Sequence, residues 1–204
     1  MPGPGGRPAP TVIIVAGVSG SGKSTVGRAL AGRLGWAYAD ADDFHPPASI
    51  AKMSAGIPLT DADRLPWLRA VAGWIRERVE TRSPGVVACS ALKRSYRELL
   101  VGGRPAAVRT VLLDGGRELI GARLAARTGH FFRPELLDSQ FRDLERPGPG
   151  EDVLTVPVTD APDEIVARVL DGLGLTRAAD RDGHQDRDRD RGRDRDPGRD
   201  HHPA

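Results

Sequence analysis

Apolar and polar residues form two alternating kinds of segment along the middle of the chain. Short runs rich in β-branched residues, such as VIIVA at 12–16 and TVLL at 110–113, are typical of strands. The longer stretches between them repeat apolar residues at helical spacing. The pattern predicts strands at 11–16, 36–39, 86–89, 108–113 and 153–158, and helices that begin near Lys23, Arg64, Ser95, Arg117 and Ala161.

This alternation of strand and helix is the βαβ pattern, which joins parallel strands through helical crossovers. The uninterrupted apolar runs favour strands that are covered on both faces, as a parallel sheet requires. We therefore predict an α/β fold with a five-stranded parallel sheet and helices on both faces.

The two ends of the chain differ from this middle part. Residues 177–204 hold eight Arg and eight Asp and no apolar residue larger than alanine apart from proline, so they cannot bury a core. The first ten residues hold four prolines and three glycines. We predict a flexible leader at 1–10, one folded domain at 11–175 and a disordered Arg/Asp-rich tail at 176–204.

Composition excludes several classes of protein. The 30 Lys and Arg against 28 Asp and Glu leave a net charge of +2, which does not favour nucleic acid or an anionic membrane as a partner. The single cysteine, Cys89, excludes an internal disulfide and zinc sites built on several cysteines. No apolar run approaches the roughly 20 residues that span a bilayer, and the start lacks the apolar core of a signal peptide. We expect a cytoplasmic protein.

A phosphate-binding loop follows the first strand directly. The motif G-x-x-x-x-G-K-[ST] is complete in Gly17-Val18-Ser19-Gly20-Ser21-Gly22-Lys23-Ser24-Thr25. We expect this loop to bind ATP through its backbone N–H groups, Lys23 to reach the β- and γ-phosphates, and Ser24 to bind Mg²⁺. The base-reading N-K-x-D of GTPases is absent, and the length suits a small-molecule kinase.

Three carboxylates follow the second predicted strand, where ligands bind in α/β proteins. Alternation along an extended segment would turn Asp40 and Asp42 to the same side. We predict Asp40 as the acid that supports Mg²⁺, with Asp114 as its rival, and Asp42 as the base that takes the proton of a substrate hydroxyl. Loop capping by these acids is the structural alternative. His45 is a candidate contact for substrate hydroxyls.

Together these segments resemble the small P-loop gluconokinases, which are relatives of shikimate kinase. The resemblance rests on DADDFHP at 40–46, KM at 52–53, GIPLTDADRLPWL at 56–68, CSALKRSYR at 89–97, GHFF at 129–132 and SQF at 139–141. It implies ATP-dependent phosphorylation of D-gluconate to 6-phospho-D-gluconate, which feeds the pentose phosphate route. It also implies a homodimer.

The resemblance assigns further residues to the acceptor. It implies that Asp42 holds the acceptor hydroxyl and that Arg64 binds the acceptor carboxylate, which a planar guanidinium can grip through two hydrogen bonds. Ser90, Lys93 and Arg94 follow the third strand, so we place them near substrate hydroxyls or the transferred phosphate. The alternative for these three is a helix cap and two surface cations.

A mobile lid is the last element that the resemblance implies. Arg123 and Arg127 lie four residues apart on one helix face, and Gly129 can act as the hinge of a lid that extends through Arg133. We expect Arg123 to contact ATP and Arg127 to support the charge on the transferred phosphate. A solvated pair of arginines is the alternative. Arg146 departs from the family pattern, which has an acidic residue there.

Two other functions stay open at this point. One is a kinase for another small hydroxy acid such as shikimate. The other is a nucleotide-dependent binding protein whose Arg/Asp tail recruits RNA or a protein. Removal of residues 177–204 separates the enzyme from the second alternative, because a kinase retains substrate-dependent ADP release.

Overall fold

The computed structural model describes residues 9–126 and 134–176. The chain divides into two units, Met1–Gly174 and Leu175–Ala204, and residues 175 and 176 are the described part of the second. The leader and tail lie almost wholly outside the described residues, so the domain boundaries stay predictions. The predicted lid, from Gly129 through Arg133, also lies outside them.

Five parallel strands form one sheet in the order β2-β3-β1-β4-β5, which confirms the predicted fold class. Both ends of each strand lie within one residue of their predicted positions. Ile14 in the central strand pairs with Val87 on one side and Thr110 on the other. The strands are β1 (Val12–Ala16), β2 (Ala37–Asp40), β3 (Gly85–Ala88), β4 (Val108–Asp114) and β5 (Val153–Pro157).

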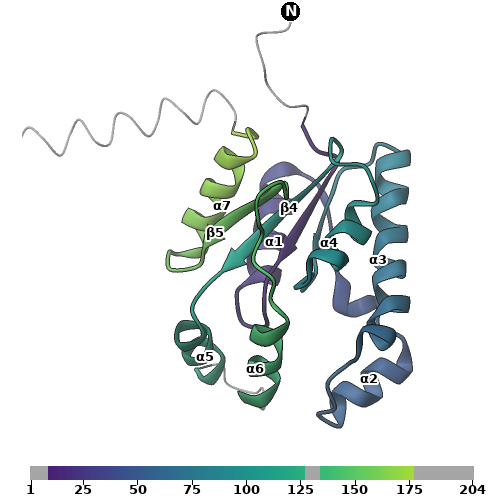
Figure 1. The fold of residues 1–204 in the computed structure, drawn as a ribbon. Coiled ribbons are helices and arrows are strands. Elements are labelled where there is room, and N and C mark those ends of the chain that lie inside the picture. The colour runs from purple at the N-terminus through teal and green to yellow at the C-terminus, as the bar shows by residue number, and fades with distance from the viewer. Residues whose placement is uncertain (1–8, 127–133, 177–204) are drawn as a thin grey trace, which may run out of the picture. The chain divides into compact units, whose positions relative to one another are not determined.

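Helices cover both faces of this sheet, as predicted (Figure 1). Helices α1 and α7 pack on one face, and α3 and α4 on the other. The pattern did not predict α2, α6 or the 3-10 turn η1. The bounds are α1 (Lys23–Leu34), η1 (Ala41–Phe44), α2 (Pro47–Ser54), α3 (Asp61–Glu80), α4 (Arg94–Val101), α5 (Arg117–Ala125), α6 (Pro134–Asp143) and α7 (Pro162–Gly172).

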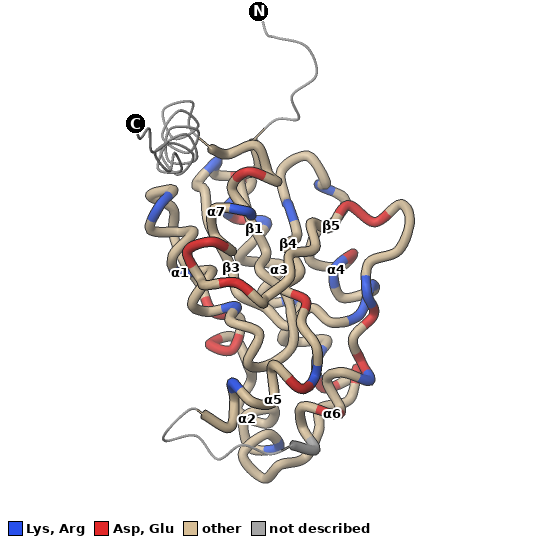
Figure 2. The backbone as a smooth tube through the Cα atoms, turned by 90° about the vertical axis from the view of Figure 1, so that its left-hand side faces the viewer, with Lys and Arg blue, Asp and Glu red and all other residues tan. Residues whose placement is uncertain are grey.

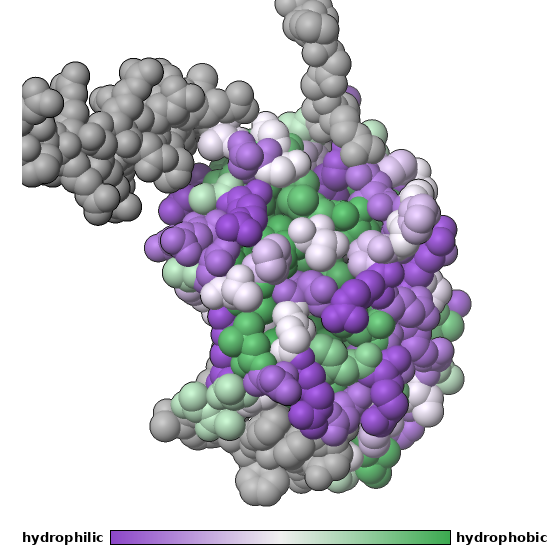
Figure 3. Space-filling model, turned by 60° about the vertical axis from the view of Figure 1, so that its left-hand side comes forward, coloured by the Kyte–Doolittle hydropathy of each residue, from purple (hydrophilic) through white to green (hydrophobic). Residues whose placement is uncertain are grey.

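The core is centred on β1, whose five residues are all fully buried. One side of β1 packs against helix α3, which contributes Trp67, Leu68, Val71 and Ile75 to the core. The edge strand β5 is covered less completely, since Val156 is its one buried residue. On the face shown in Figure 3, apolar side chains reach the surface between hydrophilic ones.

The strand order places the candidate chemistry at one end of the sheet. Strands β2 and β3 lie on one side of β1, whereas β4 and β5 lie on the other side, so the strand order reverses at β1. In parallel sheets, ligands bind at the carboxyl ends of the strands where the order reverses in this way. Helices α2, α5 and α6 lie beyond those ends (Figure 1). Basic and acidic residues are interspersed over the described elements (Figure 2). Among the described residues, no helix is long and apolar enough to cross a membrane.

Candidate active site

The phosphate loop connects β1 to α1 in a conformation that requires glycine. Gly17 has φ of +143°, and a Cβ atom there would lie 2.7 Å from Ser21 Oγ and 2.8 Å from the carbonyl oxygen of Leu113. Gly22 caps the N-terminus of α1 with φ of +97°. The loop and the first turn of α1 thus bring successive backbone N–H groups together, as the binding of a polyphosphate requires. Lys23 Nζ donates a hydrogen bond to Val18 O at 2.9 Å.

A pair of oxygen ligands lies beside this loop. Ser24 Oγ donates to Asp40 Oδ2 at 2.9 Å, and Tyr38 OH donates to the same carboxylate oxygen at 2.9 Å. Burial raises the pKa of Tyr38 to about 12, so its hydroxyl stays protonated and remains a donor. A hydroxyl and a carboxylate at the phosphate loop fit Mg²⁺, which binds through one or two protein oxygens and substrate phosphates. Among the described residues, no cluster of three or more His, Cys, Asp or Glu could hold a metal by itself.

Asp42 lies in a 3-10 turn, so the predicted extended segment was wrong. The chain bends directly after β2 because Asp40 Oδ1 accepts a hydrogen bond from Asp42 N at 3.2 Å and caps η1. The turn gives the carboxylates of Asp40 and Asp42 different surroundings. Asp40 is bound to Ser24, whereas the side chain of Asp42 is 86% exposed and lies 3.9 Å from His45 Nε2.

A cavity of about 260 Å³ connects the phosphate loop with η1, α3 and α6. The loop contributes Ser19 and Lys23 to its wall. The predicted acceptor residues Asp42, His45, Arg64 and Ser90 line the same cavity. The fold therefore brings the lysine of the phosphate loop, the exposed carboxylate of Asp42 and the guanidinium of Arg64 to one cavity, although they come from three different segments.

Helices α4 and α6 hold the side chain of Arg64 in place. Its side chain is 15% exposed, and Nη1 donates to Asp143 Oδ2 at 2.8 Å and to Tyr96 OH at 3.3 Å. Burial alone would lower the pKa of Arg64, but the hydrogen bonds with Tyr96 and Asp143 outweigh it and the pKa is raised. The guanidinium is thus a fixed cation in the cavity wall.

His45 is a packed side chain in the wall of this cavity. Its ring stacks on Trp67 with centroids 4.4 Å apart, and Trp67 Nε1 donates to Ala41 O at 2.6 Å. Burial lowers the pKa of His45. These contacts join η1 to α3 and hold the segment that carries Asp42.

Several predicted site residues do not line the cavity. Lys93 Nζ pairs with Asp61 at 2.7 Å, and Arg94 Nε pairs with Glu98 of its own helix at 2.8 Å. Arg123 Nη2 donates to Val158 O at 2.6 Å. Arg127 lies outside the described residues. Ser90 does not cap α4, because Lys93 is the residue at that position.

Asp114, the rival for the magnesium role, has a different partner. Both of its carboxylate oxygens accept hydrogen bonds from Arg146, at 3.0 and 3.2 Å. The basic residue that departs from the family pattern therefore neutralises Asp114. Since Asp40 instead contacts Ser24 of the phosphate loop, the geometry favours Asp40.

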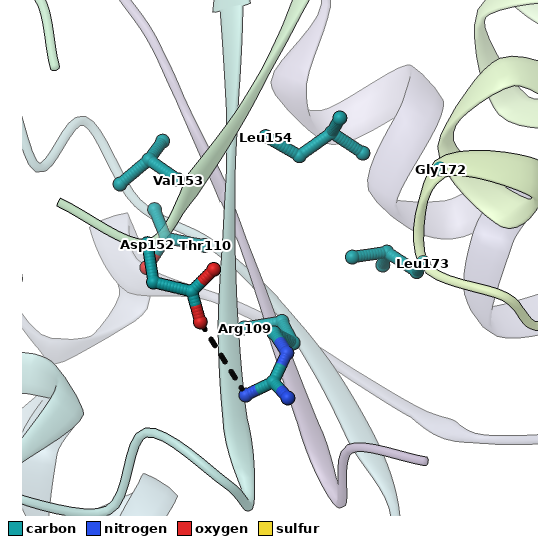
Figure 4. Close-up of a pocket in the computed structure, with 7 residues that line it drawn as sticks. All are labelled: Arg109, Thr110, Asp152, Val153, Leu154, Gly172 and Leu173. Atoms are coloured by element: carbon teal, nitrogen blue, oxygen red, sulfur yellow. Dashed lines mark ion pairs between the residues drawn. The ribbon is translucent and has the colours of Figure 1, made fainter. Parts of the chain in front are cut away.

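A second cavity of about 220 Å³, whose lining residues are drawn in Figure 4, lies at the opposite end of the sheet. It lies between the first residues of β4 and β5 and the end of α7. Arg109 and Asp152 in its wall carry opposite charges 3.8 Å apart. Because ligands of parallel sheets bind at the carboxyl ends of strands, the cavity at the phosphate loop is the candidate active site.

Known proteins resemble this chain in sequence and in fold. Residues 12–147 match the AAA domain family. A gluconokinase from Gluconobacter oxydans is 45% identical over 161 residues, which cover 79% of this chain and 90% of that protein. The chain belongs to the gluconokinase family. The crystal structure of a family member from Sinorhizobium meliloti 1021 matches with a TM-score of 0.74 and 46% identity, covering 82% of this chain and 94% of that one.

A more distant match concerns the fold alone. A shikimate kinase from Bacteroides thetaiotaomicron has 18% identity and a TM-score of 0.56, and the match covers 81% of this chain and 99% of that one. The P-loop kinase fold thus extends beyond the gluconokinase family.

Sequence reasoning missed the residues of α6 that contact the site. Gln140 lines the cavity, and Asp143 binds Arg64. The motif SQF at 139–141 had signalled the gluconokinase family without giving Gln140 a role. Tyr96, which also lines the cavity, lay in the CSALKRSYR motif in the same way.

Proposed function

We propose that the protein transfers the γ-phosphoryl group of ATP to a hydroxyl of D-gluconate and releases ADP and 6-phospho-D-gluconate. The observation that carries this proposal is the single cavity that Lys23, Asp42 and Arg64 line together. A phosphate cation, a proton acceptor and a carboxylate-binding cation are the groups that a sugar-acid kinase needs. The identity to gluconokinases supports D-gluconate as the acceptor.

The transfer assigns one task to each side chain. Arg64 binds the gluconate carboxylate, and its contact with Asp143 fixes the guanidinium plane. Lys23 and the loop N–H groups hold the phosphates. The acceptor hydroxyl oxygen forms a bond to the γ-phosphorus while the bond to the β–γ bridging oxygen breaks, and the hydroxyl proton passes to Asp42. Mg²⁺, held by Ser24 and Asp40, would supply positive charge to the phosphates.

Coupled ADP release tests this proposal. The assay compares D-gluconate, shikimate and no acceptor, using the wild type, Asp42→Asn and the matched control Asp43→Asn on the same turn. We expect gluconate-dependent turnover that falls about 10²- to 10⁴-fold in Asp42→Asn and stays near wild type in Asp43→Asn. Turnover with shikimate in place of gluconate would support the other hydroxy-acid kinase. No acceptor-dependent turnover would overturn the kinase assignment.

The remaining assignments belong to the same proposal. We infer a homodimer in the cytoplasm whose product feeds the pentose phosphate route, on the strength of the family. Arg123 and Arg127 retain their proposed roles towards ATP and the transferred phosphate. Sedimentation at several concentrations tests the dimer. The gluconokinase relatives favour the enzyme over a nucleotide-dependent binding protein, and ADP release by a chain that ends at residue 176 tests that choice.

A further inference from the structure

A glutamine on α6 binds directly to the phosphate loop. Ser19 N donates a hydrogen bond to Gln140 Oε1 at 2.6 Å, across 121 residues of sequence. Backbone N–H groups of this loop are the donors that cradle phosphate oxygens in P-loop proteins. The side-chain oxygen of Gln140 and a phosphate oxygen are therefore alternative acceptors for the same N–H group.

This contact lies in the cavity that holds the groups proposed for phosphoryl transfer. Ser19, Lys23, Asp42 and Gln140 all line the one cavity. Lys23 marks the β- and γ-phosphate end of the nucleotide, and Asp42 marks the acceptor hydroxyl. Gln140 is therefore a polar side chain in the wall of the proposed donor and acceptor site, and it has no part in the transfer proposed above.

Helix α6 is held so that this side chain faces the cavity. Three residues after Gln140, on the same helix face, Asp143 binds Arg64 at 2.8 Å. Directly after the helix, the Glu145 backbone N donates to Leu92 O at 3.0 Å, and the Glu145 carboxylate accepts from Arg94 N at 2.7 Å. The helix is thus attached to the phosphate loop, to the acceptor arginine and to the segment that follows β3.

We propose that Gln140 is a further catalytic residue that donates a hydrogen bond from Nε2 to the γ-phosphoryl oxygens during transfer. The side-chain amide has one acceptor oxygen and a nitrogen with two donor hydrogens. When a phosphate oxygen accepts the Ser19 N–H, the amide turns about its last torsion and presents the nitrogen. A fixed donor at the developing charge stabilises the transition state. This inference rests on the proposed function.

Two variants at one position separate this role from a structural one. Gln140→Glu keeps an acceptor for Ser19 N–H but replaces the donor with a negative charge, whereas Gln140→Leu removes both. A structural tie predicts that Gln140→Glu remains active. The catalytic role predicts that kcat falls about 10²-fold in Gln140→Leu and at least as far in Gln140→Glu. In both variants KM for gluconate stays within about threefold of wild type, since the acceptor arginine is intact.

Nucleotide binding gives a second readout that needs no gluconate. Calorimetry compares ADP with a non-hydrolysable ATP analogue in each variant. We expect Gln140→Glu to weaken the binding of the analogue by at least about tenfold relative to the binding of ADP, because the new carboxylate repels the γ-phosphate, which ADP lacks. Arg142→Gln, on the exposed side of the same helix, is the matched control and should leave both quantities unchanged.

Three results would overturn the inference. These are wild-type kcat in Gln140→Glu, an unchanged ratio of analogue to ADP affinity in that variant, or equal losses in Arg142→Gln. Thermal unfolding and ADP binding establish that each variant is folded. If the wild type does not phosphorylate gluconate, the proposed function fails by itself, and the ratio of nucleotide affinities still decides the role of Gln140.

Discussion

Replacement of the buried Arg97 by methionine should destabilise the fold strongly. The Arg97 side chain is 2% exposed. Its Nε and Nη2 donate to the two carboxylate oxygens of Glu151, and its Nη1 donates to the carbonyl oxygens of Ala91 at 3.2 Å and Leu92 at 2.8 Å. Ala91 has φ of +40°, a strained value for a residue with a side chain. Arg97 thus holds the turn that carries Ser90 into the cavity.

The expected loss of unfolding free energy follows from the groups that Arg97→Met leaves without a partner. Glu151, whose side chain is 10% exposed, would lose its counter-charge, and breaking a buried pair from one side costs about 3–5 kcal/mol. For a domain of this size, that corresponds to a fall in Tm of about 6–20 °C. The double variant Arg97→Met with Glu151→Leu removes both charges. The double variant should recover part of the lost free energy of unfolding. It should not recover all of it, because the carbonyl oxygens of Ala91 and Leu92 still lack their donor, which costs about 1–3 kcal/mol.

Urea unfolding of the two single variants, the double variant and the wild type measures these terms as a cycle. Arg94→Met is the matched control on the same helix, because its pair with Glu98 is exposed and is worth about 0.3–0.5 kcal/mol. A loss below about 1 kcal/mol in Arg97→Met, or one equal to that of Arg94→Met, would refute the reasoning.

Three further predictions concern helix α3, pH and the cysteine. Thr60→Ala removes the side chain that caps α3 through Asp63 N at 3.3 Å, so unfolding in urea should show a loss of about 1 kcal/mol, and no measurable loss would contradict the capping role. Burial lowers the pKa of His45 in the fold, so its stabilising effect is lost as pH falls below the unfolded value of about 6.5. His45→Phe keeps an aromatic ring on Trp67, and its Tm should fall less between pH 7.5 and 5.5 than that of the wild type; equal falls would exclude His45 as the cause. Burial raises the pKa of Cys89 to about 12, so iodoacetamide at pH 8 should label it after unfolding, and labelling of the folded protein would contradict this.

The elements that the sequence predicted are those whose signals are local. The apolar run of β1, the glycines of the phosphate loop and the polar start of α1 lie within about 25 residues, and each has a direct physical reason. The start of α3 was placed three residues late. Thr60 and Asp63 form a reciprocal capping box there, and this signal was present in the sequence.

The parts that sequence reasoning could not supply depend on contacts between distant segments. The bend after β2 follows from one hydrogen bond that Asp40 makes to the backbone of Asp42. The inward side of α6 is defined by Ser19 and Arg64, which lie about 80 to 120 residues before it. Lys93 and Arg94 were placed near the substrate from their position after β3, but Asp61 and Glu98 bind their charged ends.

Helix α6 contacts the phosphate loop through Gln140 and Arg64 through Asp143, within a single turn. An effort to change acceptor preference would naturally vary Asp143, yet any shift of the helix there also moves Gln140 at the phosphate loop. Substitutions at the two positions should therefore be strongly non-additive. Libraries that randomise both codons together would reach altered acceptors that stepwise selection, one position at a time, discards as inactive.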